Sequence, residues 1–186
     1  MAEPTNPWTT LSTREVYRNP WIAVSESAVR NPQGGPGIYG VVHFQNRAIG
    51  VVPIDEEGCT WLVGQFRYAL GTYEWEIPEG GCPLGEAPLA AAHRELLEET
   101  GLRAERMELL LDNIALSNSV TDERGTLYVA RNLTMGESAP EETEDLRLRR
   151  LPLSEAIKMV KKGAITDSLS VIALLCLANR MDPEAR

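Results

Sequence analysis

The sequence predicts an α/β or α+β sandwich with an N-terminal antiparallel strand region. Three observations point to it: β-branched and aromatic runs fill the first half of the chain, a well-delimited helix follows them, and two further helices end it. The length of 186 residues suits one domain with a core of ordinary size.

The first half is expected to be mostly strands. Residues 14–30 hold two β-prone runs separated by Asn19-Pro20, and a glycine-rich turn follows at residues 33–37. Further strands are expected at residues 38–44, 48–54, 60–68 and 73–77. Because only short polar turns separate the first three of these, we expect those three to be antiparallel neighbours. A turn at residues 78–81 is expected to close the fourth.

The helices have clear end signals. Pro88 suits a first helical turn and Gly101 suits a left-handed cap, so a helix is expected over residues 88–100. Later strands are expected near residues 108–116, 126–132 and 146–151. Two helices should end the chain, over residues 153–162 and 168–180, the second capped by Asp167.

The charge and the residue composition exclude some classes of function and favour others. A net charge of −9 and a pI of about 4.8 argue against nucleic-acid binding, since that affinity comes mainly from lysine and arginine at phosphates. If phosphate is the substrate, this acidic chain must recruit a divalent cation. Three widely spaced cysteines and two histidines favour neither a disulfide framework nor a thiolate zinc site. Oxygen ligands for Mg²⁺ or Mn²⁺ are favoured instead.

The sequence also predicts a cytoplasmic protein that does not enter a membrane. The N-terminus lacks the basic start and apolar stretch of a secretory signal. The longest apolar run, residues 171–178, has eight residues, against the roughly 20 that a membrane-spanning helix needs.

The most informative residues are three glutamates of the first predicted helix. Glu95, Glu98 and Glu99 stand at i, i+3 and i+4, which places all three carboxylates on one helical face. Like charges at this spacing repel unless a cation lies between them, and a hard divalent ion accepts several carboxylate oxygens. A solvated acidic helix face is the plain alternative.

The residues around these glutamates favour the metal site. The stretch from Gly80 to Leu102 resembles the Nudix box at every fixed position of that motif: Gly80, Glu86, Arg94-Glu95-Leu96, Glu98-Glu99 and Gly101-Leu102. This resemblance implies a Nudix-type α/β/α sandwich with mixed sheets. It also implies hydrolysis, with Mg²⁺ or Mn²⁺, of a nucleoside diphosphate linked to another moiety.

The resemblance further implies roles for single residues. Glu95 and Glu99 are expected to be metal ligands, with Glu98 a ligand or its close support. The main-chain carbonyl of Glu79, just before the box glycine, is expected to be a further ligand.

Two other parts of the site follow from the same resemblance. Arg94 is expected to orient the carboxylates by pairing with Glu86 or Glu98. An acidic loop after the box is expected to deliver the catalytic base, as Glu142 or Glu144, with Glu142 favoured; a solvated acidic loop is the plain alternative.

Outside the box, residues 14–180 more loosely resemble the branch of ADP-ribose and nucleotide-sugar pyrophosphatases. The likeness lies in residues 65–68, 74–80, 142–147 and 168–174. ADP-ribose hydrolases often carry Ser-Pro-Gly where this chain has Ser117-Asn118-Ser119. Other nucleoside diphosphate sugars, such as GDP-mannose, therefore remain alternative substrates. The alternatives are hydrolysis of dinucleoside polyphosphates or deoxynucleoside triphosphates, and a nucleotide-sugar sensor without catalysis.

Three residues outside the box are expected to bind substrate. Arg67 is placed at a phosphate, and Tyr17 and Trp21 at a base, although such an arginine is often solvated and such aromatics often pack in a core or interface. We expect residues 1–45 to form the N-terminal strand region and residues 46–186 the Nudix domain. The apolar last helix and the N-terminal strands predict a homodimer.

Overall fold

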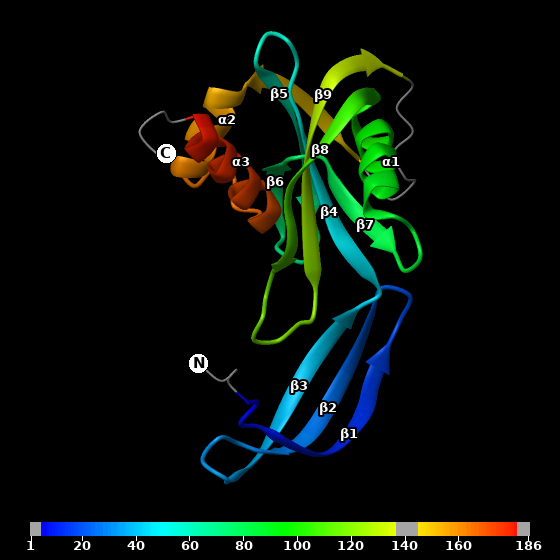
Figure 1. The fold of residues 1–186 in the computed structure, drawn as a ribbon, viewed down its shortest axis with the longest axis vertical. Coiled ribbons are helices and arrows are strands. Elements are labelled where there is room, and N and C mark those ends of the chain that lie inside the picture. The colour runs from blue at the N-terminus through cyan, green and yellow to red at the C-terminus, as the bar shows by residue number, and fades with distance from the viewer. Residues whose placement is uncertain (1–4, 137–144, 182–186) are drawn as a thin grey trace. The chain divides into compact units, whose positions relative to one another are not determined.

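The computed structural model describes residues 5–136 and 145–181, and in them the strands form three sheets (Figure 1). The strand orders are β1-β2-β3, β10-β5-β6 and β7-β4-β9-β8. The strands are β1 Thr9–Arg18, β2 Ile22–Arg30, β3 Pro36–Phe44, β4 Asn46–Pro53, β5 Cys59–Arg67, β6 Thr72–Glu76, β7 Glu79–Pro83, β8 Leu102–Ala115, β9 Arg124–Met135 and β10 Arg147–Pro152. The helices are α1 Pro88–Thr100, α2 Leu153–Lys161 and α3 Ser168–Met181.

The first sheet is an antiparallel arrangement of β1, β2 and β3. The chain turns from β1 into β2 because the side-chain oxygen of Asn19 accepts the backbone N–H groups of Trp21 and Ile22, at 2.9 and 2.8 Å. Backbone hydrogen bonds also join the segment Ala115–Glu123 to β3. The described residues up to Asn46 and this segment therefore form one compact unit.

The other described residues form a second compact unit, which contains α1, the helix that carries the glutamates of the Nudix box and is called the box helix below. In it, β4 and β9 run parallel, and β5 pairs antiparallel with β10 and β6. Figure 1 shows α1 on one side of these sheets and α2 and α3 on the other. The predicted α/β/α sandwich of mixed sheets is thus confirmed.

Helix α1 begins and ends where the sequence predicts. Pro88 lies in its first turn, and Gly101 takes the left-handed conformation, with φ 70°, and donates its N–H to Leu97 O. Ala92 and Leu96 are fully buried on the face of the helix that packs into the core. The core residues around them come from the four-stranded sheet and include Ile49, Val51, Leu102, Tyr128 and Ala130.

The expected antiparallel pairing of residues 38–44, 48–54 and 60–68 is wrong. The corresponding strands β3, β4 and β5 lie in three different sheets, and β4 pairs in parallel with β9. Asp55 does reverse the chain after β4, since its side chain accepts the N–H groups of Glu57 and Cys59. However, the last five residues of β4 are buried, and a strand of this kind needs cover on both faces, which turn chemistry does not reveal.

Two boundaries also differ from the prediction. Residues 79–83 form the edge strand β7 where a turn was expected, because the backbone continues beside β4 after Pro78. The strand expected at residues 108–116 begins at Leu102, directly after the helix cap. Its first half carries charged residues because β8 is an edge strand with exposed positions.

None of the helices that the structure describes is long and apolar enough to cross a membrane.

Candidate active site

Two glutamates of α1 are almost completely buried. Glu95 is 8% exposed and Glu99 is 3% exposed, although both carry ionisable carboxyl groups. Carboxylates are rarely buried to this extent unless a cation, an ion pair or hydrogen bonds compensate their charge. These positions therefore need partners close by.

Arg94 is one such partner, and it joins the helix to the loop before it. Its Nη1 donates to Glu95 Oε1 at 2.7 Å and to Glu98 Oε2 at 3.0 Å. Its Nη2 donates to Glu86 Oε2 at 3.0 Å and to the carbonyl of Gly81 at 2.8 Å. The hydrogen bond with Glu86 raises the pKa of Arg94 and lowers the pKa of Glu86. Arg94 thus fixes the directions of three carboxylates at once.

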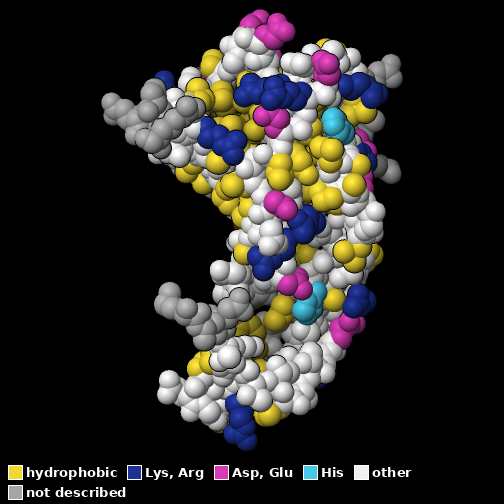
Figure 2. All heavy atoms as spheres, viewed as in Figure 1, with side chains coloured by type: hydrophobic (Ala, Val, Ile, Leu, Met, Phe, Trp, Pro, Cys, Tyr) yellow, Lys and Arg dark blue, Asp and Glu magenta, His cyan; other side chains and the backbone are white. Residues whose placement is uncertain are grey.

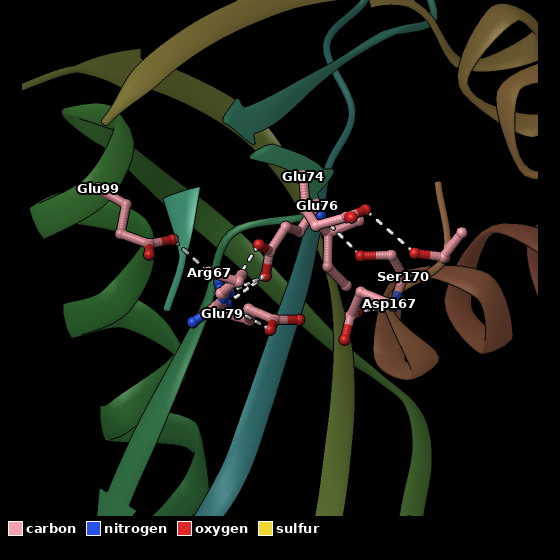
Figure 3. Close-up of polar contacts among 9 residues, drawn as sticks. Arg67, Glu74, Glu76, Glu79, Glu99, Asp167 and Ser170 are labelled. Carbon is pink, nitrogen blue, oxygen red and sulfur yellow. Dashed lines mark hydrogen bonds and ion pairs between the residues drawn. The ribbon is translucent and has the colours of Figure 1, made fainter. Parts of the chain in front are cut away.

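The main chain of β7 contacts the carboxylates of Glu95 and Glu99. The backbone N–H of Glu79 donates to Glu99 Oε2 at 2.9 Å, a contact that Figure 3 shows. The next residue is Gly80, where a Cβ atom would lie 2.5 Å from Glu95 Oε1 and still closer to the rest of that carboxylate. Glycine therefore lets the Glu95 carboxylate approach the backbone of β7.

Carboxylate oxygens are the ligand type that Mg²⁺ and Mn²⁺ prefer, so Glu95, Glu98 and Glu99 are chemically suited to such an ion. Their roles as metal ligands, and that of the main-chain carbonyl of Glu79, stay predictions. The burial of two of the carboxylates adds a second argument, because a bound cation would offset their desolvation.

Arg67 lies at the end of β5 and is held by two carboxylates (Figure 3). Its Nε donates to Glu76 Oε1 at 2.7 Å, and its Nη2 donates to Glu79 Oε1 at 2.9 Å. The hydrogen bonds with Glu76, which is 1% exposed, raise the pKa of Arg67 above its ordinary value. The substrate-binding role of Arg67 stays a prediction, since the guanidinium is occupied by protein carboxylates here.

The start of α3 brings a third carboxylate to this place. Asp167 Oδ2 accepts the N–H of Ser170 at 2.7 Å, and Ser170 Oγ accepts the N–H of Ile77 at 2.9 Å, which ties α3 to the chain after β6. Oxygen atoms of Glu76, Glu79 and Asp167 lie within 4.8 Å of one another. The three side chains line a cavity of about 380 Å³. Burial raises the pKa of Glu79 well above its usual value, and the charges of Asp167 and Glu76 raise it further.

The remaining predicted site residues belong to the N-terminal unit or fall outside the described residues. Tyr17 and Trp21 belong to the N-terminal unit and are 54% and 68% exposed. Glu142 and Glu144, the two candidates for the base, lie outside the described residues.

The sequence alone assigns no role to Glu76 or Asp167. Glu76 belongs to the stretch that resembles nucleotide-sugar pyrophosphatases, and that likeness was a usable signal. Asp167 is recognisable only as a helix cap, because its distance from Glu79 along the chain hides their proximity in space.

The chain belongs to the NUDIX domain family, since residues 44–173 match that family. The match covers the box helix and the strands on which it packs. Residues 8–42 match a second family, the nucleoside diphosphate sugar hydrolase N-terminal domain. The protein is therefore a Nudix hydrolase with the N-terminal domain of nucleoside diphosphate sugar hydrolases.

The chain is also similar to individual proteins over most of its length. The chain is 35% identical over 167 residues to a methanol dehydrogenase activator of Bacillus methanolicus, covering 89% of each chain. It is 32% identical over 172 residues to an ADP-ribose pyrophosphatase of Mycobacterium tuberculosis, covering 90% of this chain and 82% of the relative. A crystal structure of an ADP compounds hydrolase superposes with a TM-score of 0.85 over the whole of both chains, at 22% identity, which shows the same fold.

Proposed function

We propose that this protein hydrolyses the pyrophosphate bond of ADP-ribose or a related nucleoside diphosphate sugar, giving a nucleoside monophosphate and a sugar phosphate. The observation that carries the proposal is the pair of buried carboxylates, Glu95 and Glu99, held against the backbone of β7. The N-terminal domain and the relatives named ADP-ribose pyrophosphatase support this substrate class.

Glu95 and Glu99 would hold Mg²⁺ or Mn²⁺ together with the main-chain carbonyl of Glu79, with Glu98 as a further ligand or as support. A cation held there would supply charge screening for the pyrophosphate and a lower pKa for the attacking water. Arg94 keeps the carboxylates directed at the cation through its hydrogen bonds to Glu95 and Glu98.

The attacking water also needs a base. The glutamates of α1 are engaged with the cation or with Arg94, so we assign the base to the acidic stretch after β9, as Glu142 or Glu144. Glu98 is the alternative base.

Substrate contacts are assigned to three residues. Arg67 binds a phosphate by exchanging one of its carboxylate partners for a phosphate oxygen, a change that its 38% exposed side chain permits. Tyr17 and Trp21 stack on the nucleobase of the substrate, and their exposure in the N-terminal unit supports this role.

The two regions of the chain are assigned different roles, and the protein is assigned an oligomeric state. We propose that residues 1–45 form the N-terminal strand region with dimer contacts, that residues 46–186 form the catalytic domain, and that the protein is a homodimer in the cytoplasm. Large apolar side chains of the N-terminal sheet, including Leu11 and Ile38, are 58% and 76% exposed. Figure 2 shows apolar side chains at the surface of each unit. A second copy of the chain would cover part of this surface.

A substrate panel tests the proposal. The purified protein is incubated with Mg²⁺ or Mn²⁺ and with ADP-ribose, GDP-mannose, ADP-glucose, a dinucleoside polyphosphate or a deoxynucleoside triphosphate, and phosphate is measured after phosphatase coupling. We expect ADP-ribose or another nucleoside diphosphate sugar to be cleaved fastest. Preference for a triphosphate or a dinucleoside polyphosphate would overturn the assigned substrate class, and binding without turnover would identify a sensor.

A further inference from the structure

We propose a second divalent-cation site in this protein, formed by the side chains of Glu76, Glu79 and Asp167 and separate from the site on α1. The inference rests on the proposed function only in that it takes the α1 glutamates to hold a cation of their own.

Glu79 takes part in both places, through different atoms. Its N–H donates to Glu99 and its carbonyl is the ligand assigned to the α1 site, whereas its side chain turns toward Arg67 (Figure 3). Oxygen atoms of Glu76, Glu79 and Asp167 lie within 4.8 Å of one another, close enough for one ion to touch all three.

One oxygen atom of the Glu79 carboxylate is a second, independent observation in favour of a cation here. Oε1 accepts the hydrogen bond from Arg67, but Oε2 is buried and has no hydrogen-bond partner. In Figure 3 this oxygen points away from Arg67, on the side where Asp167 lies. A buried carboxylate oxygen without a partner is costly, and a cation would satisfy it.

The charges of the group also match a divalent ion. Three carboxylates face one guanidinium, that of Arg67, which leaves a charge of about −2 when all groups are ionised. A divalent cation would neutralise the group, and the adjoining cavity of about 380 Å³ has room for its water ligands or for an anionic oxygen of a ligand.

One further carboxylate at the cavity already has hydrogen-bond partners. Glu74 also lines it, but its carboxylate accepts hydrogen bonds from Thr72 and Thr166, at 2.8 and 3.0 Å. Glu74 therefore offers a matched control, an acidic residue of the same cavity outside the proposed ligand set.

The test counts bound Mn²⁺ by electron paramagnetic resonance after the protein has been stripped with a chelator. Asp167→Asn removes a ligand charge and keeps a side-chain oxygen for the Ser170 N–H, so α3 should stay capped. We expect this variant to lose one Mn²⁺ equivalent, or at least tenfold in its affinity, and Glu74→Gln to bind as the wild type does. Glu99→Gln should retain the site that depends on Asp167.

The results separate the two proposals. If Asp167→Asn binds Mn²⁺ with wild-type stoichiometry and affinity, or if Glu99→Gln binds none, the second site does not exist. Loss of turnover in Glu99→Gln supports the proposed function in either case. Should Asp167→Asn fail to fold, Glu79→Gln replaces it, because that variant keeps the backbone groups of Glu79; unchanged Mn²⁺ binding in Glu79→Gln would equally overturn the second site.

Discussion

Gly80→Ala is predicted to impair catalysis without preventing folding. The added Cβ would lie 2.5 Å from Glu95 Oε1, whereas ordinary contacts begin at 3.4 Å, so the carboxylate must move by about 1 Å. Arg94 and the burial of Glu95 resist a larger rearrangement. A displacement of this size at a catalytic group costs roughly 100-fold in rate, which corresponds to about 2.7 kcal/mol of transition-state stabilisation.

The assay measures kcat and kcat/KM for ADP-ribose at saturating Mg²⁺, with circular dichroism and thermal unfolding as checks on the fold. Gly40→Ala is the matched control, because a Cβ there meets its nearest atom at 3.9 Å and lies in a strand of the N-terminal sheet. We expect wild-type kinetics for Gly40→Ala. If Gly80→Ala is folded and retains kcat/KM within threefold of the wild type, then the position of the Glu95 carboxylate does not control the reaction.

Three further predictions follow from the site and the fold. Glu142→Gln should lower kcat by roughly 10²–10⁴-fold with unchanged metal affinity, and the same loss in Glu144→Gln alone would move the base two residues along. The pKa of Asp112 is lowered, first by the hydrogen bond from Thr126, so its ionised form stabilises the fold above its unfolded-state pKa and this contribution disappears as pH falls through the lowered pKa. Because the Asp112 side chain is half exposed, Asp112→Asn should lower Tm by only about 1–2 °C at pH 7, with a smaller difference from the wild type near pH 3, and an equal difference at both pH values would contradict this. Light scattering should give about twice the chain mass of 20.5 kDa, and a monomer would contradict the homodimer.

Local signals made the helices predictable from the sequence. Pro88 and Gly101 delimit α1, and Asp167 caps α3, because each signal depends on backbone geometry within one turn. The α/β/α class was also predictable, since it follows from the order of the elements and from the box motif.

Strand partners were not predictable in the same way. The turn at Asp55 resembles a hairpin turn, yet β4 and β5 belong to different sheets. β4 lies between β7 and β9 in the four-stranded sheet, and its buried residues need cover on both faces, which the turn does not reveal. In the site, too, some residues could be predicted from local sequence and others could not. Glu95, Glu98 and Glu99 follow from helical spacing, but the approach of Asp167 to Glu79 depends on how α3 packs after β6, which is a property of the whole fold.

The most direct test of the central claim compares the wild type with Glu99→Gln in the hydrolysis of ADP-ribose with Mg²⁺. We expect the wild type to release AMP and ribose 5-phosphate only when the divalent cation is present. Glu99→Gln, with a Tm close to that of the wild type, should be slower on the order of 10³-fold, because a ligand charge is lost. Turnover of Glu99→Gln within tenfold of the wild type, or wild-type turnover that survives chelation, would contradict the assignment of α1 as the metal-binding helix of a pyrophosphatase.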